Sequence, residues 1–192
     1  MDRCKKDLFC LKTAAIKEEE TTIFSFKKPS ITKTVIGVGS VDRGAGTTCV
    51  CLAFANFICN KMGMKTAYIE LNTTNQIKAL SKKDSLDSFT YLGIHIFPST
   101  KVTSLSEILK RDYDYFILDM GVLTNYTATE FSKCQKQFLV GDFCEWKKQG
   151  TLSKIKDLFQ NTCLNWEQVM ILKNFTNEST RFRFNFCNGL NR

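Results

Sequence analysis

From about residue 34 onward, the chain alternates between two kinds of apolar pattern. One is a short run of β-branched and aromatic residues, which is typical of a strand buried on both faces of a sheet. The other is a longer segment with apolar residues at helical spacing. Strands are predicted at 34–39, 65–71, 91–97, 113–120, 137–140 and 168–172, and helices at 48–62, 76–82, 104–110, 127–133 and 146–159. This alternation predicts an α/β fold with three layers, in which helices cover both faces of a doubly wound, mostly parallel sheet.

Local signals set the expected ends of some of these elements. Gly63 follows the first helix and is expected to cap its C-terminus. Pro98 is expected to end the strand at 91–97. Ser104, with Glu107 three residues later, predicts a capping box at the start of a helix.

The two ends of the chain lack the alternation. Residues 1–30 are charged and weakly periodic, and we expect an N-terminal arm there. Residues 31–180 form the expected single domain, a size that can bury a full core. Residues 181–192 form a C-terminal tail, for which an edge strand and an irregular end are both compatible with the pattern.

The net charge of +8 raises the question of a polyanionic partner. Nucleic acid and an anionic membrane surface both attract such a chain. The lysines, however, are spread along the sequence, and no run of five like charges occurs. A solvated basic face, including Trp146-Lys-Lys148, Lys154 and Lys156, is therefore the simpler interpretation, and contact of that face with lipid or a partner is its alternative. A basic nucleic-acid-binding module is kept as a further alternative for the whole chain.

Nine cysteines accompany a single histidine, His95, and no C-x-x-C occurs, so a zinc site is not expected. No signal peptide is visible and no apolar stretch approaches twenty residues, so a transmembrane segment is not expected either. Free thiols suit a reducing compartment. We therefore expect a cytoplasmic protein, with peripheral attachment to a membrane as an open alternative, and packing roles for His95, Cys49 and Cys51.

A glycine-rich segment joins the first strand to the first helix. Its sequence is Val35-Ile-Gly-Val-Gly-Ser-Val-Asp-Arg-Gly-Ala-Gly-Thr-Thr48. Glycines there let backbone N–H groups approach an anion, and the helix adds the positive end of its dipole. The segment therefore predicts a phosphate site formed by Arg43, Gly44, Ala45, Gly46, Thr47 and Thr48. The alternative is a tight turn that serves packing alone.

A Walker A loop, G-x-x-x-x-G-K-[ST], differs from this segment at two positions. Thr47 stands where the lysine is expected, and Val41 where the first glycine is expected. Thr48 keeps the hydroxyl that ligates Mg²⁺, and Asp119 near a later strand end is a second candidate Mg²⁺ contact or, alternatively, a turn residue. Without the lysine, binding of ATP with Mg²⁺ is expected to be weak or absent and hydrolysis to suffer more. No catalytic residue is assigned.

Several segments together resemble the ParA/MinD class of P-loop ATPases. The loop 42–48 resembles that family's deviant Walker A motif, K-G-G-x-G-K-[ST]. The segments Leu52-Ala-Phe-Ala-Asn56 and Gly63-Met-Lys-Thr-Ala-Tyr-Ile-Glu70 resemble its first helix and second strand. The segment Tyr113-Asp-Tyr-Phe-Ile-Leu-Asp-Met-Gly121 resembles its Walker B strand, Y-D-x-x-x-x-D. The order agrees from about residue 34 to residue 174, which implies a P-loop NTPase fold.

Departures from the family pattern fall on its charged residues. Asp42 stands where the family has its signature lysine, and Thr47 stands where it has the second lysine. The family's acidic pair at the second strand, D-x-D, is Glu70-Leu71-Asn72 in this chain. The resemblance therefore implies a degenerate member that binds nucleotide weakly and regulates or localises partners. Arg43 could replace a lysine in an active ATPase, which is the first alternative.

Partners follow from the resemblance alone. Sandwich dimers are usual in the family, so self-association is implied. The form Arg43-Gly-Ala-Gly-Thr-Thr48 is also similar to the TadZ/CpaE group, which implies pilus or secretion machinery as a partner. A weaker G-x-G signal at Gly37 and Gly39, with Glu70 as a ribose contact, would instead indicate a dinucleotide site.

Overall fold

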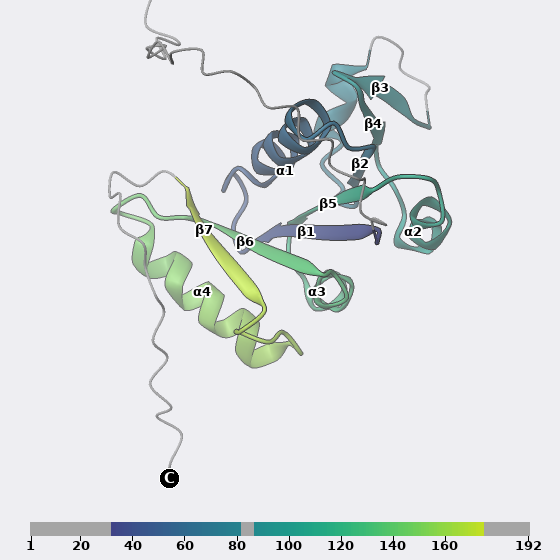
Figure 1. Cartoon of the computed structure of the whole chain (residues 1–192). Coiled ribbons are helices and arrows are strands. Elements are labelled where there is room, and N and C mark those ends of the chain that lie inside the picture. Colours follow the sequence, from purple (N-terminus) through teal and green to yellow (C-terminus); the bar gives the residue numbers. More distant parts are fainter. Residues whose placement is uncertain (1–31, 82–86, 175–192) are drawn as a thin grey trace, which may run out of the picture. The chain divides into compact units, whose positions relative to one another are not determined.

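A seven-stranded sheet forms the centre of the computed structural model, which describes residues 32–81 and 87–174 (Figure 1). The strands are β1 (Thr34–Ser40), β2 (Thr66–Glu70), β3 (Phe89–Tyr91), β4 (Ile94–Phe97), β5 (Tyr115–Val122), β6 (Lys136–Asp142) and β7 (Val169–Asn174). Their order is β3-β4-β2-β5-β1-β6-β7, and the neighbours pair in parallel except β3 with β4. The expected N-terminal arm and C-terminal tail lie outside the described residues.

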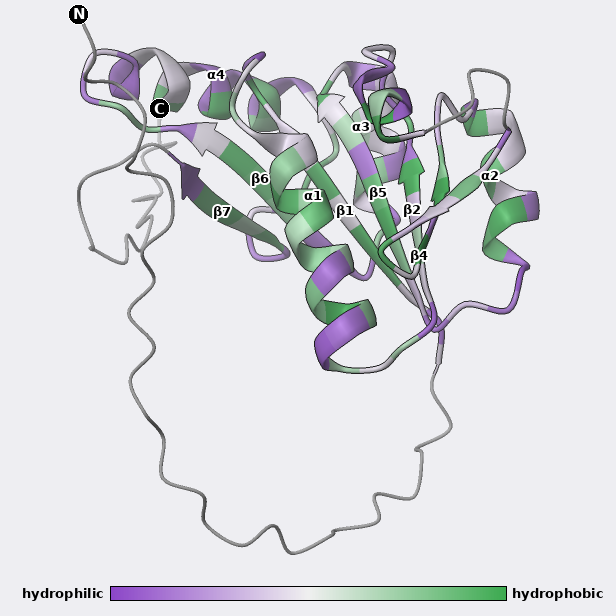
Figure 2. Cartoon of the chain, turned by 90° about the horizontal axis from the view of Figure 1, so that it is seen from above, coloured by the Kyte–Doolittle hydropathy of each residue, from purple (hydrophilic) through white to green (hydrophobic). Residues whose placement is uncertain are grey.

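Helices cover both faces of the sheet, as Figure 2 shows. They are α1 (Thr47–Asn56), the π-helical turn η1 (Phe57–Lys61), the 3-10 helix η2 (Gln76–Leu80), α2 (Val102–Leu109), α3 (Asn125–Ser132) and α4 (Lys148–Asn161). On one face Cys51 and Ala55 of α1 pack near Val38 of β1. On the other face α2, α3 and α4 bury a second core that includes Phe131 and Ile155. The predicted three-layer, doubly wound α/β fold is confirmed.

The chain reverses its direction across the sheet at β1. One neighbour of β1 is β5 and the other is β6, so the segments that follow these three strands leave from the same edge. Open α/β sheets bind ligands at such a switch point, beyond the carboxyl ends of the strands. The glycine-rich loop after β1 and Asp119 of β5 both lie there.

The single strand predicted at 91–97 is wrong. The segment forms an antiparallel hairpin in which β3 pairs with β4 through Leu92 and Gly93. These two residues have φ values of 50° and 80°, as in the two-residue turns that match the twist of paired strands. Leucine is an uncommon residue at positive φ, which is why the turn is hard to see in the sequence.

Several helix ends also differ from expectation. The predicted capping box at Ser104 is wrong, because α2 begins at Val102 and the Ser104 N–H already donates to the Lys101 carbonyl at 3.0 Å. A capping box forms instead at α3, where Thr124 and Thr127 exchange side-chain and backbone hydrogen bonds. The expected helix at 76–82 is a short 3-10 helix, and the helix expected from residue 146 begins at residue 148.

Cysteine burial is mixed. Cys51, in α1, is buried, and its pKa lies well above the usual value, first because of burial and then because of nearby Asp119. Cys49 is exposed, so the packing role expected for it is wrong.

Within the part of the chain that the structure describes, no helix has both the length and the apolar character needed to span a bilayer.

Candidate functional site

The loop between β1 and α1, residues 41–46, turns directly from strand into helix. Gly44 and Gly46 have φ values of 76° and 92°, which glycine adopts without the strain that a Cβ would bring. The Ser40 hydroxyl fixes the start of the loop by contacting the Asp42 carbonyl at 3.0 Å and the Gly121 carbonyl at 3.2 Å. The two glycines therefore let the backbone turn directly from β1 into α1.

The first N–H groups of α1 have no acceptor among the described residues. Gly46 is the N-cap residue, no side chain caps the helix, and its first turn contains no acidic residue. Among the described residues, no protein group accepts a hydrogen bond from the N–H of Thr47 or of Thr48. These donors, with the positive end of the helix dipole, can hold an anion such as phosphate.

Thr48 and Asp119 meet at this edge of the sheet. The Thr48 hydroxyl donates a hydrogen bond of 2.7 Å to Oδ2 of Asp119, across 71 residues of sequence. Asp119 is fully buried and also accepts hydrogen bonds from the Tyr68 hydroxyl at 2.6 Å and from the Gly121 N–H at 3.1 Å. A hydroxyl and a carboxylate are oxygen groups of the kind that Mg²⁺ takes as ligands, so the structure brings together the two residues expected to contact the metal.

The other predicted binding residues differ in how far their side chains are exposed to solvent. The Arg43 side chain is exposed, whereas Ala45 and Thr47 are buried. A ligand in the loop could therefore meet the side chains of Arg43 and Thr48. The remaining four residues, Gly44, Ala45, Gly46 and Thr47, can offer only backbone groups.

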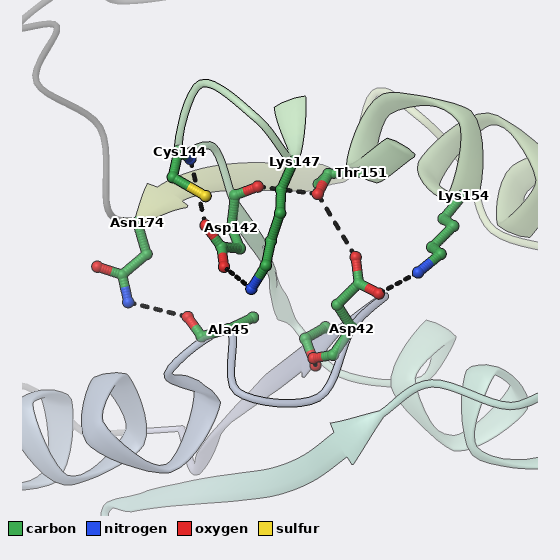
Figure 3. A network of polar contacts seen from close by, with 9 residues as sticks. Asp42, Ala45, Asp142, Cys144, Lys147, Thr151, Lys154 and Asn174 are labelled. Atoms are coloured by element: carbon green, nitrogen blue, oxygen red, sulfur yellow. Dashed lines mark hydrogen bonds and ion pairs between the residues drawn. The ribbon is translucent and has the colours of Figure 1, made fainter. Parts of the chain in front are cut away.

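An ion pair ties the loop to α4. The Lys154 ammonium contacts Oδ1 of Asp42, and the Thr151 hydroxyl lies 3.4 Å from Oδ2 of the same carboxylate (Figure 3). Asp42 is therefore held toward α4 by residues 109 and 112 positions later in the chain. Lys154 is exposed, as expected of a solvated face, and its charge is in addition paired with the loop.

A second ion pair lies at the end of β6. The Lys147 ammonium is 2.7 Å from Oδ2 of Asp142, whose Oδ1 accepts a hydrogen bond of 3.2 Å from the Cys144 N–H. The hydrogen bond from Lys147 is the main reason why the pKa of Asp142 lies below its usual value, and the same hydrogen bond raises the pKa of Lys147. Asp42 also adds to the raised pKa of Lys147, which places that lysine within electrostatic reach of the loop.

Asn174, the last residue of β7, makes a third contact to the loop. Its side-chain N–H₂ donates to the Ala45 carbonyl at 2.8 Å. A Cβ added at Gly46 would stand only 2.4 Å from the same nitrogen, so a side chain at position 46 would displace the Asn174 amide. Sequence reasoning missed Asn174 and Asp142 and placed Lys147 only on a solvated basic face, since only the sheet order puts β6 next to β1 and β7 next to β6.

Glu70 is turned into the protein and not toward the loop. Its carboxylate is fully buried and accepts hydrogen bonds from the Ser99 N–H at 3.0 Å and the Ile77 N–H at 3.4 Å. Burial is the main cause that raises the pKa of Glu70. The ribose contact considered for Glu70 does not fit this geometry, because backbone amides already occupy its oxygens.

His95 lies in β4, away from the loop, and makes internal contacts. Its Nδ1 is hydrogen bonded to the Tyr113 hydroxyl, its Nε2 lies 3.1 Å from the Ser88 hydroxyl, and its ring packs 4.6 Å from that of Phe97. Burial, followed by the Arg111 guanidinium, lowers the pKa of His95. These contacts agree with the packing role expected from the sequence.

Comparison with known sequences gives no relative: no protein-family model and no curated protein matches the chain. Solved structures do match. A plasmid partition protein of Borrelia burgdorferi B31 bound to AMPPNP has a TM-score of 0.57 and 13% identity, over 78% of each chain. A ParA family ATPase from Chlorobium tepidum TLS has a TM-score of 0.55 and 16% identity, over 74% of each chain.

A third similar structure is the septum site-determining protein MinD of Pyrococcus horikoshii OT3, complexed with Mg-ADP. It has a TM-score of 0.51 and 17% identity, over 73% of this chain and 68% of that one. At such identities the likeness concerns the arrangement of strands and helices. Together with the loop after β1 and the meeting of Thr48 with Asp119, it shows that this chain has the ParA/MinD-like P-loop fold.

Proposed function

We propose that the chain is a degenerate ParA/MinD-like protein that binds a phosphate-bearing ligand, ATP with Mg²⁺ in the first place, and turns it over little or not at all. The domain that carries this function is residues 31–180. The observation that carries the proposal is the hydrogen bond of 2.7 Å between Thr48 and Asp119 at the open N-terminus of α1. The pair keeps the oxygen ligands of a Mg²⁺ site after both loop lysines have been lost.

The similar structures support the choice of ligand. The Borrelia protein was solved with AMPPNP and the Pyrococcus MinD with Mg-ADP. In this chain, the residues that would hold the phosphates are Arg43, Gly44, Ala45, Gly46, Thr47 and Thr48, with Thr48 and Asp119 toward the metal. Arg43 is exposed and can donate two parallel hydrogen bonds to a phosphate.

Charge explains why turnover would be low. Phosphoryl transfer gathers negative charge at the γ-phosphate, and a loop lysine normally stabilises it. Position 47 holds a buried threonine and position 42 a carboxylate that α4 holds beside the loop. The transition state would therefore lose the cations of the loop itself, and the Asp42 carboxylate, which is paired with Lys154, supplies none in their place, whereas ground-state binding by backbone N–H groups would persist.

A protein that binds a nucleotide without consuming it acts through what its bound state recognises. We therefore propose a regulatory or localisation role exerted on protein partners, a second copy of the chain among them. The likeness of the loop sequence to the TadZ/CpaE group favours pilus or secretion machinery as the wider setting. A location in the cytoplasm, with peripheral attachment to a membrane where the machinery sits, belongs to the same proposal.

Calorimetry with Mg-ATP, paired with an ATPase assay, tests the proposal on the full chain. We expect binding that weakens at least tenfold in Thr48→Val and stays unchanged in Thr129→Val, an exposed threonine of α3 that serves as the control. No heat at millimolar Mg-ATP would contradict nucleotide binding. Hydrolysis at ordinary ATPase rates, abolished in Thr48→Val and in Arg43→Ala, would instead identify an active enzyme in which Arg43 replaces the lysine.

A further inference from the structure

Lys147 is held in place by a buried carboxylate. Asp142 is 4% exposed and stands at the carboxyl end of β6, the strand next to β1. The Lys147 ammonium lies 2.7 Å from its Oδ2, while the Cys144 N–H contacts the other oxygen. Because this carboxylate is fixed within the protein, it determines where the ammonium group of an otherwise flexible lysine lies.

Asp142, the anchor of Lys147, adjoins the phosphate loop. The Thr151 hydroxyl donates to the Asp142 carbonyl at 2.8 Å and lies 3.4 Å from the Asp42 carboxylate, so one residue links the anchor to the loop. Asn174, which is the register partner of Asp142 in β7, contacts the Ala45 carbonyl. In Figure 3 the Lys147 side chain runs down toward the loop and ends beside the Asp142 carboxylate.

The ammonium group of Lys147 has the capacity for another ligand. It carries three N–H donors, and its hydrogen bond to Asp142 uses one. Its side chain is 50% exposed, so a ligand that enters from solvent can reach it. Lys154 also pairs with one carboxylate, but its partner is Asp42 of the loop itself, whereas Asp142, the partner of Lys147, lies buried in β6. Of the two lysines from this side of the loop, Lys147 is therefore the one that can bind a phosphate without giving up a contact with a carboxylate of the loop.

We infer that Lys147 is the cation that binds a di- or triphosphate in the β1–α1 loop, in place of the lysines absent at positions 42 and 47. The inference rests on the proposed function, since it names a residue of the same site. Asp142 is the positioning residue, which aims the ammonium at the loop. The cation thus comes from the segment before α4 of the same chain and not from the loop itself.

The test measures binding of two probes, inorganic pyrophosphate and Mg-ATP, to the full chain by calorimetry. Lys147→Met is expected to weaken both at least tenfold. The matched control is Lys156→Met, which removes the same charge from an exposed position of α4. It is expected to change either affinity less than twofold. If Lys147→Met binds both probes more weakly, Lys147 binds the phosphate groups, whether they belong to pyrophosphate or to a nucleotide. If it binds only Mg-ATP more weakly, Lys147 serves a nucleotide site.

A second variant guards against misfolding. Lys147→Met leaves the Asp142 carboxylate buried without its cation, which destabilises proteins. Asp142→Asn/Lys147→Met removes both charges and is expected to fold and still to bind at least tenfold more weakly. Wild-type affinity in either variant would overturn the inference while leaving the proposed function intact. Absence of binding by the wild-type chain would overturn both together.

Discussion

The Tyr68 hydroxyl donates a hydrogen bond of 2.6 Å to Oδ2 of Asp119, the same oxygen that accepts the hydrogen bond from Thr48. Tyr68 in β2 and Asp119 in β5 are both fully buried. Burial first, and Asp119 next, raise the pKa of Tyr68 far above its usual value, so the phenol keeps its proton and stays a donor. The Asp119 carboxylate is therefore satisfied by the protein's own donors.

Tyr68→Phe removes one of those donors and leaves a buried carboxylate less satisfied. We expect the free energy of unfolding to fall by about 1.5–3 kcal/mol, the usual range for a hydrogen bond to a charged group. Urea denaturation measures the loss. Tyr115→Phe, at a half-buried position at the start of β5, is the control and should change stability by less than about 0.5 kcal/mol. Equal losses would show that the Tyr68 hydroxyl contributes nothing special.

The loop glycines offer a matched pair of substitutions. Gly44→Ala and Gly46→Ala both place a Cβ at positive φ, a cost of about 1–2 kcal/mol. A Cβ at position 44 meets nothing within 4 Å, whereas one at position 46 displaces the Asn174 amide. We expect Gly46→Ala to cost about 1 kcal/mol more, the net value of the hydrogen bond it breaks. Adding Asn174→Ala should relieve the clash, and an equal cost for both single variants would contradict it.

His95 makes stability depend on pH. Its pKa in the folded chain lies below the unfolded value of about 6.5, so between these two values the unfolded chain binds more protons. Stability should therefore rise as pH increases through this window and fall as pH decreases through it. His95 is the only histidine, so its ring signal in an NMR titration is unambiguous and should show a midpoint below about 6.5. A midpoint at or above that value would refute the assignment.

Lys33 caps the C-terminus of α2 from outside the helix. Its ammonium donates to the carbonyls of Leu109 at 3.2 Å, Lys110 at 3.0 Å and Arg111 at 2.9 Å. A cation there offsets the negative end of the helix dipole. Lys33→Met should lower stability by about 0.5 kcal/mol in low salt and less in high salt. Lys136→Met, an exposed lysine at the start of β6, serves as the control in the same denaturation series.

The sequence was sufficient for the part of the site that its own motifs contain, the glycine-rich loop with Thr48 and the acid near the end of a buried strand. A buried β-branched run followed by glycines predicts the turn after β1, and Asp119 near the end of an apolar strand was a natural partner for Thr48. The hairpin at β3 and β4 was missed because Leu92 is an uncommon residue at positive φ. The ion pair of Asp42 with Lys154 was missed for another reason. A lysine on the polar face of an amphipathic helix looks the same whether water or a carboxylate faces it.

The contacts of Asn174 with Ala45 and of Lys154 with Asp42 have a consequence for synthesis of the chain. The ribosome makes the loop well before α4 and β7, and a chain emerges with its N-terminal part first. The glycine turn can form early, but the contact of Asp42 has to wait until α4 has left the ribosome, and that of Ala45 until β7, the last described strand, has left it. The loop is thus among the first segments to be made and among the last to reach its final set of contacts.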